Sequence, residues 1–383
     1  MADLLSDLDI EFLQSAVRVA MNGRGKVEPN PMVGCIIVKN GTQIGEGFHQ
    51  DFGGPHAEPN ALAACSESPA GATAYVTLEP CCHTNKKTPP CVPALIAAGV
   101  ARVVVGCVDP NPLVAGRGIA QLREAGIVVV DANDFVCRQL IAPYVARIVH
   151  RRPYITLKWA QTADGKVAGP GGKRIQISNR RSQRLIHELR SRCDAIMVGI
   201  ATARADDPLL TSRGIDNARP LIRIVLDSDL RLSMDSQLVR TIDRGKVVVF
   251  CSKEAADYSG TRIALAACGV EIHAVPSDSP GRLGLARIIE QLGAMNITHL
   301  LVEPGPTLAH SFLATGLWDR AWIMRSSKRV DDATAPTAAN APPNGVGEMN
   351  IDGDVLTEYL NPMGVYFGLH ASSDFALLGR IAG

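Results

Sequence analysis

Short apolar runs alternate with amphipathic segments along the first 150 residues of the chain. A helical period begins near the N-terminus, and four apolar runs of strand length follow, separated by helical patterns or turn residues. The predicted helices are Asp9–Met21, one that opens at His56, Val92–Ala98 and Gly118–Ala125, and the predicted strands are Val33–Val38, Ala74–Leu78, Val103–Val108 and Ile127–Val130. Strands that alternate with helices predict a sheet covered by helices.

A second pattern of the same kind begins after Pro153. It predicts strands Tyr154–Trp159, Ala195–Val198, Ile222–Leu226, Lys246–Phe250, Val270–His273 and His299–Val302, and helices Arg181–Arg190, Arg262–Ala267, Leu283–Leu292 and Thr307–Leu313. A chain of 383 residues exceeds the size at which a single hydrophobic core is usual. We therefore predict two α/β domains, residues 1–147 and 148–383, with the boundary near residues 145–153.

The pattern changes towards the C-terminal end. Asp331–Gly347 is rich in Ala, Pro and Asn and has no period, so we expect an exposed loop there. Tyr366–Leu369 and Phe375–Leu378 then have the pattern of closing strands. In the second half no GxGxxG follows a predicted strand, and the glycine-rich run Gly169–Arg174 lacks that spacing, so the Rossmann fingerprint is absent.

Composition narrows the classes of protein to which the chain can belong. Hydrophobic residues make up 46% of the chain and charged residues 20%, and the formal net charge is +1. This balance is typical of an ordinary globular protein, and it gives no reason to expect a nucleic-acid partner. No apolar run approaches the ~18 residues of a membrane span, so we expect no membrane association.

The cysteines and the first residues bear on location. Ten cysteines in so long a chain do not indicate a disulfide framework, and the opening MADLLSDLDI is acidic where a signal peptide would be basic and apolar. We therefore expect reduced thiols and a cytoplasmic protein. A homo-oligomer is compatible with the sequence, which leaves the oligomeric state open.

Three residues with the chemistry of zinc ligands lie in two short motifs. His56 belongs to the tetrapeptide PHAE, and Cys81 and Cys91 belong to the later EPC and TPPC segments. A neutral imidazole and two thiolates fill three corners of a zinc tetrahedron and leave the fourth for water, which predicts a catalytic zinc. Glu58 is placed to shuttle protons while zinc hydroxide attacks the ring carbon that bears the exocyclic amine.

The interval between the two cysteines is unusual for this signature. Zinc deaminases space them as CxxC, whereas nine residues separate Cys81 from Cys91, so Cys82 and His83 are rival ligands within the interval. Proline precedes both Cys81 and Cys91 and stiffens the chain there, which favours these two as the ligands. We expect Cys82 to pack nearby and His83 to line the mouth of the substrate site.

The first half resembles the deaminase of the bifunctional riboflavin-biosynthesis proteins, in which it is fused to a reductase. The resemblance covers about residues 10–325, and its deaminase half is marked by PNPMVGCIIV, GEGFHQDFGGPHAE, GATAYVTLEPCCH, TPPC and DPNPLVAGRGI. It implies a cytidine-deaminase-like α/β/α sandwich that binds Zn2+ through His56, Cys81 and Cys91, with Glu58 as the proton donor.

The same resemblance implies a small-molecule substrate, 2,5-diamino-6-(5-phosphoribosylamino)pyrimidin-4-one, which is hydrolytically deaminated. Asn30 and His49, in the PNP and GFH segments, would contact it. Each residue also has a structural alternative, since Asn30 lies between two prolines in a turn and His49 could form a hydrogen bond at a strand end.

In the second half the resemblance depends on LKWAQTADGKVA, RADDPLLTSR, RIVLDS and VEPGPTLAHSFL. It implies a dihydrofolate-reductase-like α/β domain that uses NADPH to reduce the ribosyl group of 5-amino-6-(5-phosphoribosylamino)uracil to ribityl. By position, NADPH would contact Ala160, Gln176, Thr202, Asp206, Ser228, Gly305, Pro306, Thr307, Leu308, Ala309, His310 and Ser311. The substrate would face Arg174, Arg190, Leu210, Arg213 and Glu303.

Several of these positions have structural alternatives or depart from the family pattern. Asp206 could cap a turn, and Arg190 could interact with the dipole at a helix end. Many members carry Trp where this chain has Gln176 and Ser where it has Arg174. After Arg325 the sequence RSSKRVDDATAPTAA continues where the family usually has an apolar strand and an APKLLG-like segment.

Two other functions stay open from the sequence. One is a nucleoside or base deaminase with an unrelated C-terminal domain, which would leave the arginines of the second half without a role. The other is a zinc-stabilised binding protein, which needs a fourth protein ligand, and Cys82 and His83 are the only local candidates.

Overall fold

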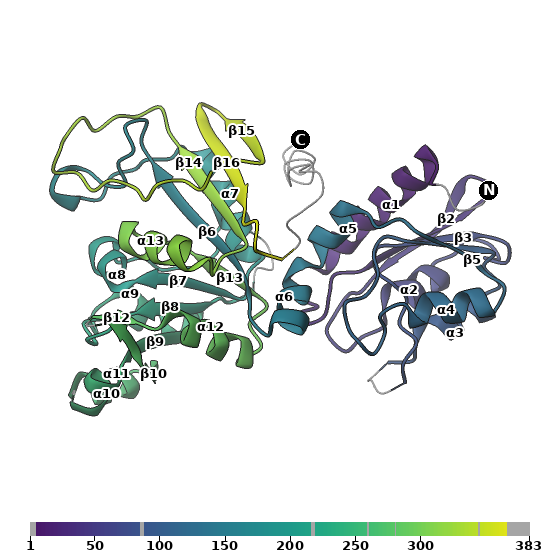
Figure 1. The fold of residues 1–383 in the computed structure, drawn as a ribbon, viewed down its shortest axis with the longest axis horizontal. Helices are drawn as coiled ribbons and strands as arrows, with labels where there is room; N and C mark the ends of the chain where they lie inside the picture. Colours follow the sequence, from purple (N-terminus) through teal and green to yellow (C-terminus); the bar gives the residue numbers. More distant parts are fainter. Residues whose placement is uncertain are drawn as a thin grey trace. The chain divides into compact units, whose positions relative to one another are not determined.

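The computed structural model describes residues 5–84, 88–215, 219–258, 260–279, 281–343 and 345–365. The chain divides into two compact units, unit 1 (Met1–His150) and unit 2 (Arg151–Gly383). Each unit has its own sheet and its own hydrophobic core (Figure 1). Within the described residues, no helix combines the length and the apolar character needed to cross a membrane.

A five-stranded sheet of order β2-β1-β3-β4-β5 forms the centre of unit 1. β1 pairs antiparallel with β2 and β3, and β3, β4 and β5 are parallel. The strands are β1 (Gly34–Lys39), β2 (Thr42–Phe48), β3 (Thr73–Val76), β4 (Arg102–Val105) and β5 (Val128–Asp131). The helices are α1 (Asp7–Ala20), η1 (Met21–Gly23), α2 (Ala57–Ala63), α3 (Cys91–Ala97), α4 (Arg117–Glu124), α5 (Phe135–Leu140) and α6 (Ala142–His150).

Helices cover both faces of this sheet because successive side chains of each strand point to opposite faces. Ile36 of β1 packs with Ala16 of α1 in one core cluster. Cys35 of the same strand belongs to the other cluster, with Ala61 of α2 and Leu95 of α3. The result is the expected three-layer α/β/α sandwich, and both metal-ligand motifs lie on the α2–α3 side.

The hydrophobic pattern did not predict β2, and the reason is its close packing against α2. A Cβ added to Gly47 would lie 2.2 Å from the backbone nitrogen of Ala61, and one added to Gly45 would lie 2.5 Å from the Ala61 carbonyl oxygen. Glycine is therefore required where an apolar side chain would otherwise announce a strand. The helices α5 and α6 were also absent from the prediction.

Unit 2 contains a nine-stranded sheet of order β10-β9-β8-β7-β13-β6-β14-β16-β15 and a two-stranded β11-β12 ribbon. In the larger sheet the β14–β16 and β16–β15 pairs are antiparallel, and the other pairs of strands are parallel. The strands are β6 (Tyr154–Gln161), β7 (Ala195–Gly199), β8 (Ile222–Leu226), β9 (Val247–Ser252), β10 (Glu271–Val275), β11 (Ser277–Ser279), β12 (Arg282–Leu283), β13 (His299–Val302), β14 (Arg320–Arg325), β15 (Gly347–Ile351) and β16 (Asp354–Leu360). The helices are η2 (Pro170–Gly172), α7 (Arg180–Ser191), α8 (Ile200–Asp206), α9 (Gln237–Arg240), η3 (Ile242–Arg244), α10 (Lys253–Tyr258), α11 (Gly260–Ala267), α12 (Leu285–Ala294) and α13 (Pro306–Thr315).

Two core clusters lie on the two faces of the larger sheet. α7 and α8 contribute Leu189 and Ala203 to one cluster. α12 and α13 contribute Ile288 and Phe312 to the other. Unit 2 is therefore also an α/β layer structure, as the alternation of patterns predicted.

The segment predicted to be an exposed loop, Asp331–Gly347, is only partly exposed at its described residues and is attached to the body of unit 2. Ala335 is buried, and the Ala338 amide donates to the carbonyl of Gly165. The segment ends one residue earlier than expected, because Gly347 begins β15. The two predicted closing strands after residue 365 lie outside the described residues.

Candidate zinc and reductase sites

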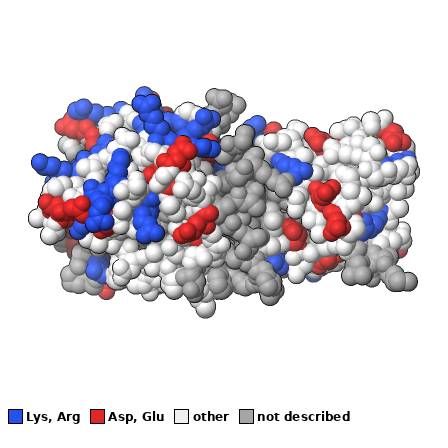
Figure 2. Space-filling model, turned by 90° about the horizontal axis from the view of Figure 1, so that it is seen from above, with Lys and Arg blue, Asp and Glu red and all other residues white. Residues whose placement is uncertain are grey.

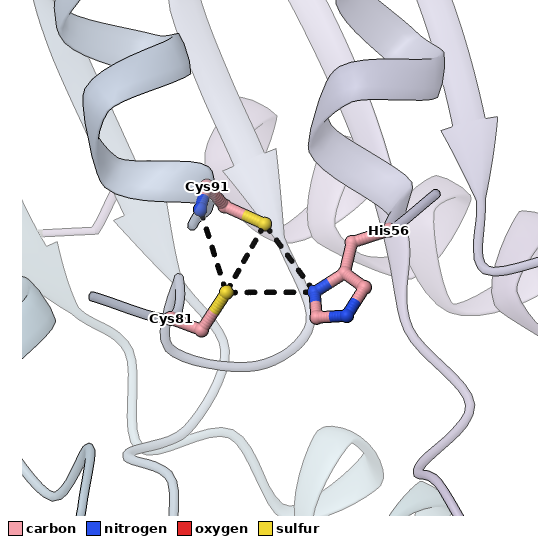
Figure 3. Close-up of side chains that lie close together, drawn as sticks. All are labelled: His56, Cys81 and Cys91. Atoms are coloured by element: carbon pink, nitrogen blue, oxygen red, sulfur yellow. Dashed lines mark hydrogen bonds between the residues drawn. The ribbon is translucent and has the colours of Figure 1, made fainter. Parts of the chain in front are cut away.

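The three predicted zinc ligands converge where α2 and α3 begin, and Cys81 comes from the loop between β3 and α3 (Figure 3). His56 is the N-cap residue of α2, and Cys91 is the first residue of α3. Nδ1 of His56 lies 3.5 Å from Sγ of Cys81 and 3.4 Å from Sγ of Cys91, and the two sulfurs are 3.3 Å apart. Three donor atoms at these separations can be ligands of a single ion.

The surroundings of these donors fit a zinc ion. The backbone amide of Cys91 donates to Sγ of Cys81 at 3.4 Å, and such a donor favours the thiolate form that zinc binds. Thr88 Oγ1 lies 3.2 Å from Nε2 of His56, on the ring atom that faces away from the sulfurs. A second polar partner of this kind fixes the ring orientation of a metal-binding histidine.

Glu58 lies in the first turn of α2 and is 2% exposed. Its Oε2 is buried and has no hydrogen-bond partner among the described residues, which is costly unless a bound group satisfies it. Burial raises the pKa of its carboxyl, and the sulfur of Cys81 adds to the increase. Glu58 therefore has the position expected of a proton-transfer group that does not bind the metal.

A cavity of about 320 Å³ is lined by the zinc-ligand candidates His56 and Cys81 and by Glu58. Asn30 and His49, both predicted to contact the substrate, also line it. Nδ1 of His49 must carry a proton, because it lies 2.9 Å from the carbonyl oxygen of Pro55, which can only accept. Nε2 then accepts from the Asn30 amide nitrogen at 3.3 Å, so the Asn30 carbonyl oxygen is left to accept from a ligand.

The two rivals within the cysteine interval have other positions. Cys82 packs against the core on the α2–α3 side of the sheet, and His83 lines the cavity. Among the described residues, the group of side chains able to share an ion consists of His56, Cys81 and Cys91. The described residues therefore do not supply the local fourth protein ligand that a purely structural zinc requires.

The cavity is also lined by polar residues that the sequence motifs did not identify. Asp109, Asn111 and Tyr144 line it together with Thr88. Asp109 and Asn111 follow β4 in the DPNP segment, and polar residues after a parallel strand could have indicated them. Burial raises the pKa of Asp109 to about 6. The sequence gave no comparable signal for Tyr144, which comes from α6.

In unit 2, two predicted substrate contacts bind each other. Nε and Nη2 of Arg190 donate to the two carboxylate oxygens of Glu303 at 2.8 and 2.7 Å, and Nη1 donates to the Thr211 carbonyl at 3.2 Å. Burial alone would raise the pKa of Glu303, but the charge and hydrogen bonds of Arg190 outweigh it and lower that pKa. Burial lowers the pKa of the neighbouring Lys158, and the charge of Glu303 opposes this shift.

Other predicted substrate residues surround this ion pair. The Arg213 amide donates to Nδ1 of His187 at 3.2 Å, and burial together with the charges of Arg190 and Arg213 lowers the pKa of His187 to about 4. Burial raises the pKa of Asp206. The positive charge of Arg174 opposes this increase, and the negative charge of Glu303 adds to the increase. The predicted residues thus form one electrostatically coupled group, to which Lys158 and His187 must be added. Leu210 is buried with a left-handed φ of 51°.

Part of the predicted NADPH site is also brought together. Gly305 is the N-cap of α13, the helix that carries Pro306, Thr307, Leu308, Ala309, His310 and Ser311. A Cβ added to Gly305 would lie 3.1 Å from Oγ1 of Thr202 in α8. The first turn of α13 presents free amide groups of the kind that bind a phosphate.

The remaining predicted cofactor positions have separate contacts. Ser228 follows β8 and donates to the carbonyl of Gly281 at 3.0 Å. The carbonyl of Gln176, in an exposed loop, accepts from Nζ of Lys328 at 2.6 Å. Ala160, near the end of β6, packs against the core on the α7–α8 face.

The sandwich fold and the His–Cys–Cys triangle define unit 1 as a zinc-dependent deaminase domain, which is joined here to a second α/β domain with a charged site. A family model described as the cytidine and deoxycytidylate deaminase zinc-binding region matches residues 6–107. The RibD C-terminal domain model matches residues 153–339.

Relatives extend over both units. The chain is 40% identical to the riboflavin biosynthesis protein RibD of Actinobacillus pleuropneumoniae over 90% of this chain and 89% of that protein. It is 40% identical to RibD of Escherichia coli K12 over 84% of this chain and 88% of that protein. The chain therefore belongs to the RibD family of bifunctional riboflavin biosynthesis proteins, and it is a deaminase and reductase enzyme.

Solved structures agree with this assignment. The structure of Acinetobacter baumannii RibD superimposes with a TM-score of 0.79 at 32% identity, covering 92% of this chain and 98% of that one. A Thermotoga maritima protein described as a diaminohydroxyphosphoribosylaminopyrimidine deaminase/5-amino-6-(5-phosphoribosylamino)uracil reductase gives 0.79 at 32% identity, covering 92% and 99%.

These comparisons confirm the family resemblance and the two-domain α/β fold. The cofactors are zinc for the deaminase domain and NADPH for the reductase domain. A deaminase with an unrelated C-terminal domain is not favoured, because the relatives match the second half as well. A purely structural zinc protein is not favoured either.

Proposed function

We propose that residues 1–147 deaminate 2,5-diamino-6-(5-phosphoribosylamino)pyrimidin-4-one, and that residues 148–383 then reduce the ribosyl group of 5-amino-6-(5-phosphoribosylamino)uracil with NADPH. The observation that carries the first assignment is the triangle of His56, Cys81 and Cys91 in one cavity with Glu58. The substrates named for the Thermotoga maritima relative support both assignments.

In the deaminase half, His56, Cys81 and Cys91 would hold the zinc. When bound there, zinc acts as a Lewis acid that activates the attacking water. Glu58 takes up a proton at its unpartnered Oε2 and delivers it to the departing amine. Asn30, held by His49, accepts a hydrogen bond from the substrate and orients it.

In the reductase half, the first turn of α13 binds a cofactor phosphate, and Thr202 lies beside it. The group around Glu303 and Arg190 faces the substrate, and Arg174 and Arg213 supply positive charge for its phosphate. Lys and Arg side chains are numerous on the face of unit 2 seen in the left part of Figure 2, with Asp and Glu among them. Positive charge of this kind attracts the phosphates that both proposed ligands carry.

The cellular setting also belongs to the proposal. A net charge of +1 gives no reason for a nucleic-acid partner, and the apolar segments give none for a membrane. We place the enzyme in the cytoplasm, acting on small molecules. A homo-oligomer is compatible with this role, and sedimentation analysis measures it directly.

The deaminase assignment is tested by Glu58→Gln. We expect the variant to retain zinc and its fold but to release ammonia from the pyrimidine at least about a hundredfold more slowly, because proton transfer is lost. Glu46→Gln is the matched control, since Glu46 is exposed on β2 and bonded only to Gln43 among the contacts described. Undiminished ammonia release by Glu58→Gln would refute the role.

The cofactor assignment is tested by Thr202→Ala. We expect a higher KM for NADPH in the reduction of 5-amino-6-(5-phosphoribosylamino)uracil and an unchanged rate of ammonia release from the pyrimidine. Thr315→Ala, at the far end of α13, is the control. Equal KM values for NADPH in the wild type and Thr202→Ala would reject this contact.

A further inference from the structure

The cavity of the deaminase unit contains a tyrosine from the last helix of that unit. Tyr144 lies in α6, which ends at His150, the last residue of unit 1. Its side chain is buried, and its hydroxyl donates to Oδ1 of Asp109 at 3.2 Å across 35 positions of sequence. Because the ionised carboxylate only accepts, the phenol is the donor in this bond.

The backbone around Asp109 is already fixed by other contacts. The Asp109 amide donates to Oε2 of Glu79 at 3.2 Å, and the Asn111 amide donates to Oδ1 of Asp109 at 2.8 Å. Glu79 also accepts from the amides of Gly116 and Gly118, both at 2.8 Å. The loop therefore has backbone anchors of its own, and the Tyr144 hydroxyl adds a side-chain contact that fixes the rotation of the carboxylate.

The carboxylate offers one oxygen to a ligand. Asp109 is 6% exposed and lines the cavity that also contains His56 and Glu58. Its Oδ1 receives both bonds described above, whereas Oδ2 has no hydrogen bond to any other described residue. A buried negative oxygen repels a phosphate and accepts from an amino or hydroxyl group.

We propose that Tyr144 is a positioning residue of the deaminase, which holds the Asp109 carboxylate so that Oδ2 accepts a hydrogen bond from an amino or ribose hydroxyl group of the substrate. The inference depends on the proposed deaminase function. Tyr144 touches the substrate only through Asp109 in this account, so its removal weakens binding and leaves the chemical step intact. The effect should thus appear in KM and not in kcat.

The test is Tyr144→Phe in the full-length zinc enzyme, with Tyr75→Phe as the matched control. Tyr75 is also buried and donates to a buried carboxylate, Asp9 Oδ1, at 2.8 Å, but neither residue lines the cavity. We expect Tyr144→Phe to raise the KM for the pyrimidine about three- to tenfold, which is the range for one hydrogen bond of ordinary strength, with kcat within about twofold. Tyr75→Phe should leave that KM unchanged.

A double-mutant cycle with Asp109→Asn separates positioning from a general structural effect. If Tyr144 acts through Asp109, Tyr144→Phe raises KM by less than about twofold in the Asp109→Asn background. An unchanged KM in Tyr144→Phe, an equal rise in Tyr75→Phe, or a full rise in the Asp109→Asn background would each overturn the inference. So would a loss of bound zinc in Tyr144→Phe. If the wild-type enzyme releases no ammonia from the pyrimidine, the proposed deaminase function itself is refuted.

Discussion

Arg190 and Glu303 form a bidentate ion pair that joins α7 to the residue after β13, with nitrogen–oxygen distances of 2.8 and 2.7 Å. The family resemblance implies that both residues face the substrate, and in the structure they also bind each other. The pair leaves the planar guanidinium of Arg190 with little capacity for a phosphate. We therefore expect Arg174 and Arg213 to provide the charge that a substrate phosphate meets.

Removing one member of this pair should destabilise unit 2. In Arg190→Ala the carboxylate of Glu303 remains partly buried without its main partner, which costs roughly 3 kcal/mol in the free energy of unfolding. The reductase rate should fall with it, while zinc content and ammonia release persist. Arg181→Ala is the control, because the pair of Arg181 with Asp352 is exposed and contributes at most about 1 kcal/mol. Equal melting temperatures for the two variants would contradict this prediction.

The hydrogen bond between Thr88 and His56 should support metal binding. Thr88→Val removes the oxygen that lies 3.2 Å from Nε2, so the ring loses the partner that orients it. We expect about ten- to a hundredfold weaker zinc binding, measured by competition with a chelator of known affinity. Thr42→Val, on the exposed start of β2, should bind zinc as the wild type does. An affinity within twofold of the wild type would show that Thr88 has no such role.

Glu79 should be essential to the deaminase unit for structural reasons. Its carboxylate accepts four backbone amides, from Asp109, Gly116, Gly118 and Ile119. Glu79→Ala leaves these donors unsatisfied and should lower the free energy of unfolding by at least about 3 kcal/mol. Denaturant unfolding measures the loss, and Glu124→Ala, on the exposed face of α4, is the control. A loss no larger than that of the control would contradict the account.

His187 should make unit 2 less stable in mild acid. Its pKa is about 4 in the folded protein and about 6.5 in an unfolded chain, so the unfolded chain takes up a proton first as the pH falls. The contribution of His187 to stability therefore declines between pH 6.5 and 4 and is constant below that range. His187→Gln should reduce the difference in melting temperature between pH 7 and pH 5. An identical pH dependence in the variant would show that His187 is not the cause.

The sequence predicted the layer order of both units because buried parallel strands and amphipathic helices have distinct periods. It missed β2 because Gly45 and Gly47 replace apolar residues where α2 packs closely. It also missed β14, although its run Ala321–Met324 is as fully buried as the predicted strand His299–Val302.

The sequence can indicate candidate site residues where ligand chemistry limits the residue type, and it cannot where only three-dimensional contact matters. His56, Cys81 and Cys91 are recognisable because few residues bind zinc, and the structure places them together. Tyr144 carries no such signal, because a tyrosine near the end of a helix is usually a packing residue. The mutual pairing of Arg190 and Glu303 likewise depends on which strand edge meets α7, and spacing along the chain does not reveal it.

The most direct measurement of the whole account is a coupled assay of the full-length zinc enzyme with the diaminopyrimidine substrate and NADPH. The wild type should release one ammonia and oxidise one NADPH for each ribityl product formed. Glu58→Gln should do neither with this substrate, yet should oxidise NADPH at the wild-type rate when supplied with 5-amino-6-(5-phosphoribosylamino)uracil. The proposed function would be contradicted if Glu58→Gln oxidised NADPH at the wild-type rate with the diaminopyrimidine substrate. It would also be contradicted if the wild type formed no ribityl product.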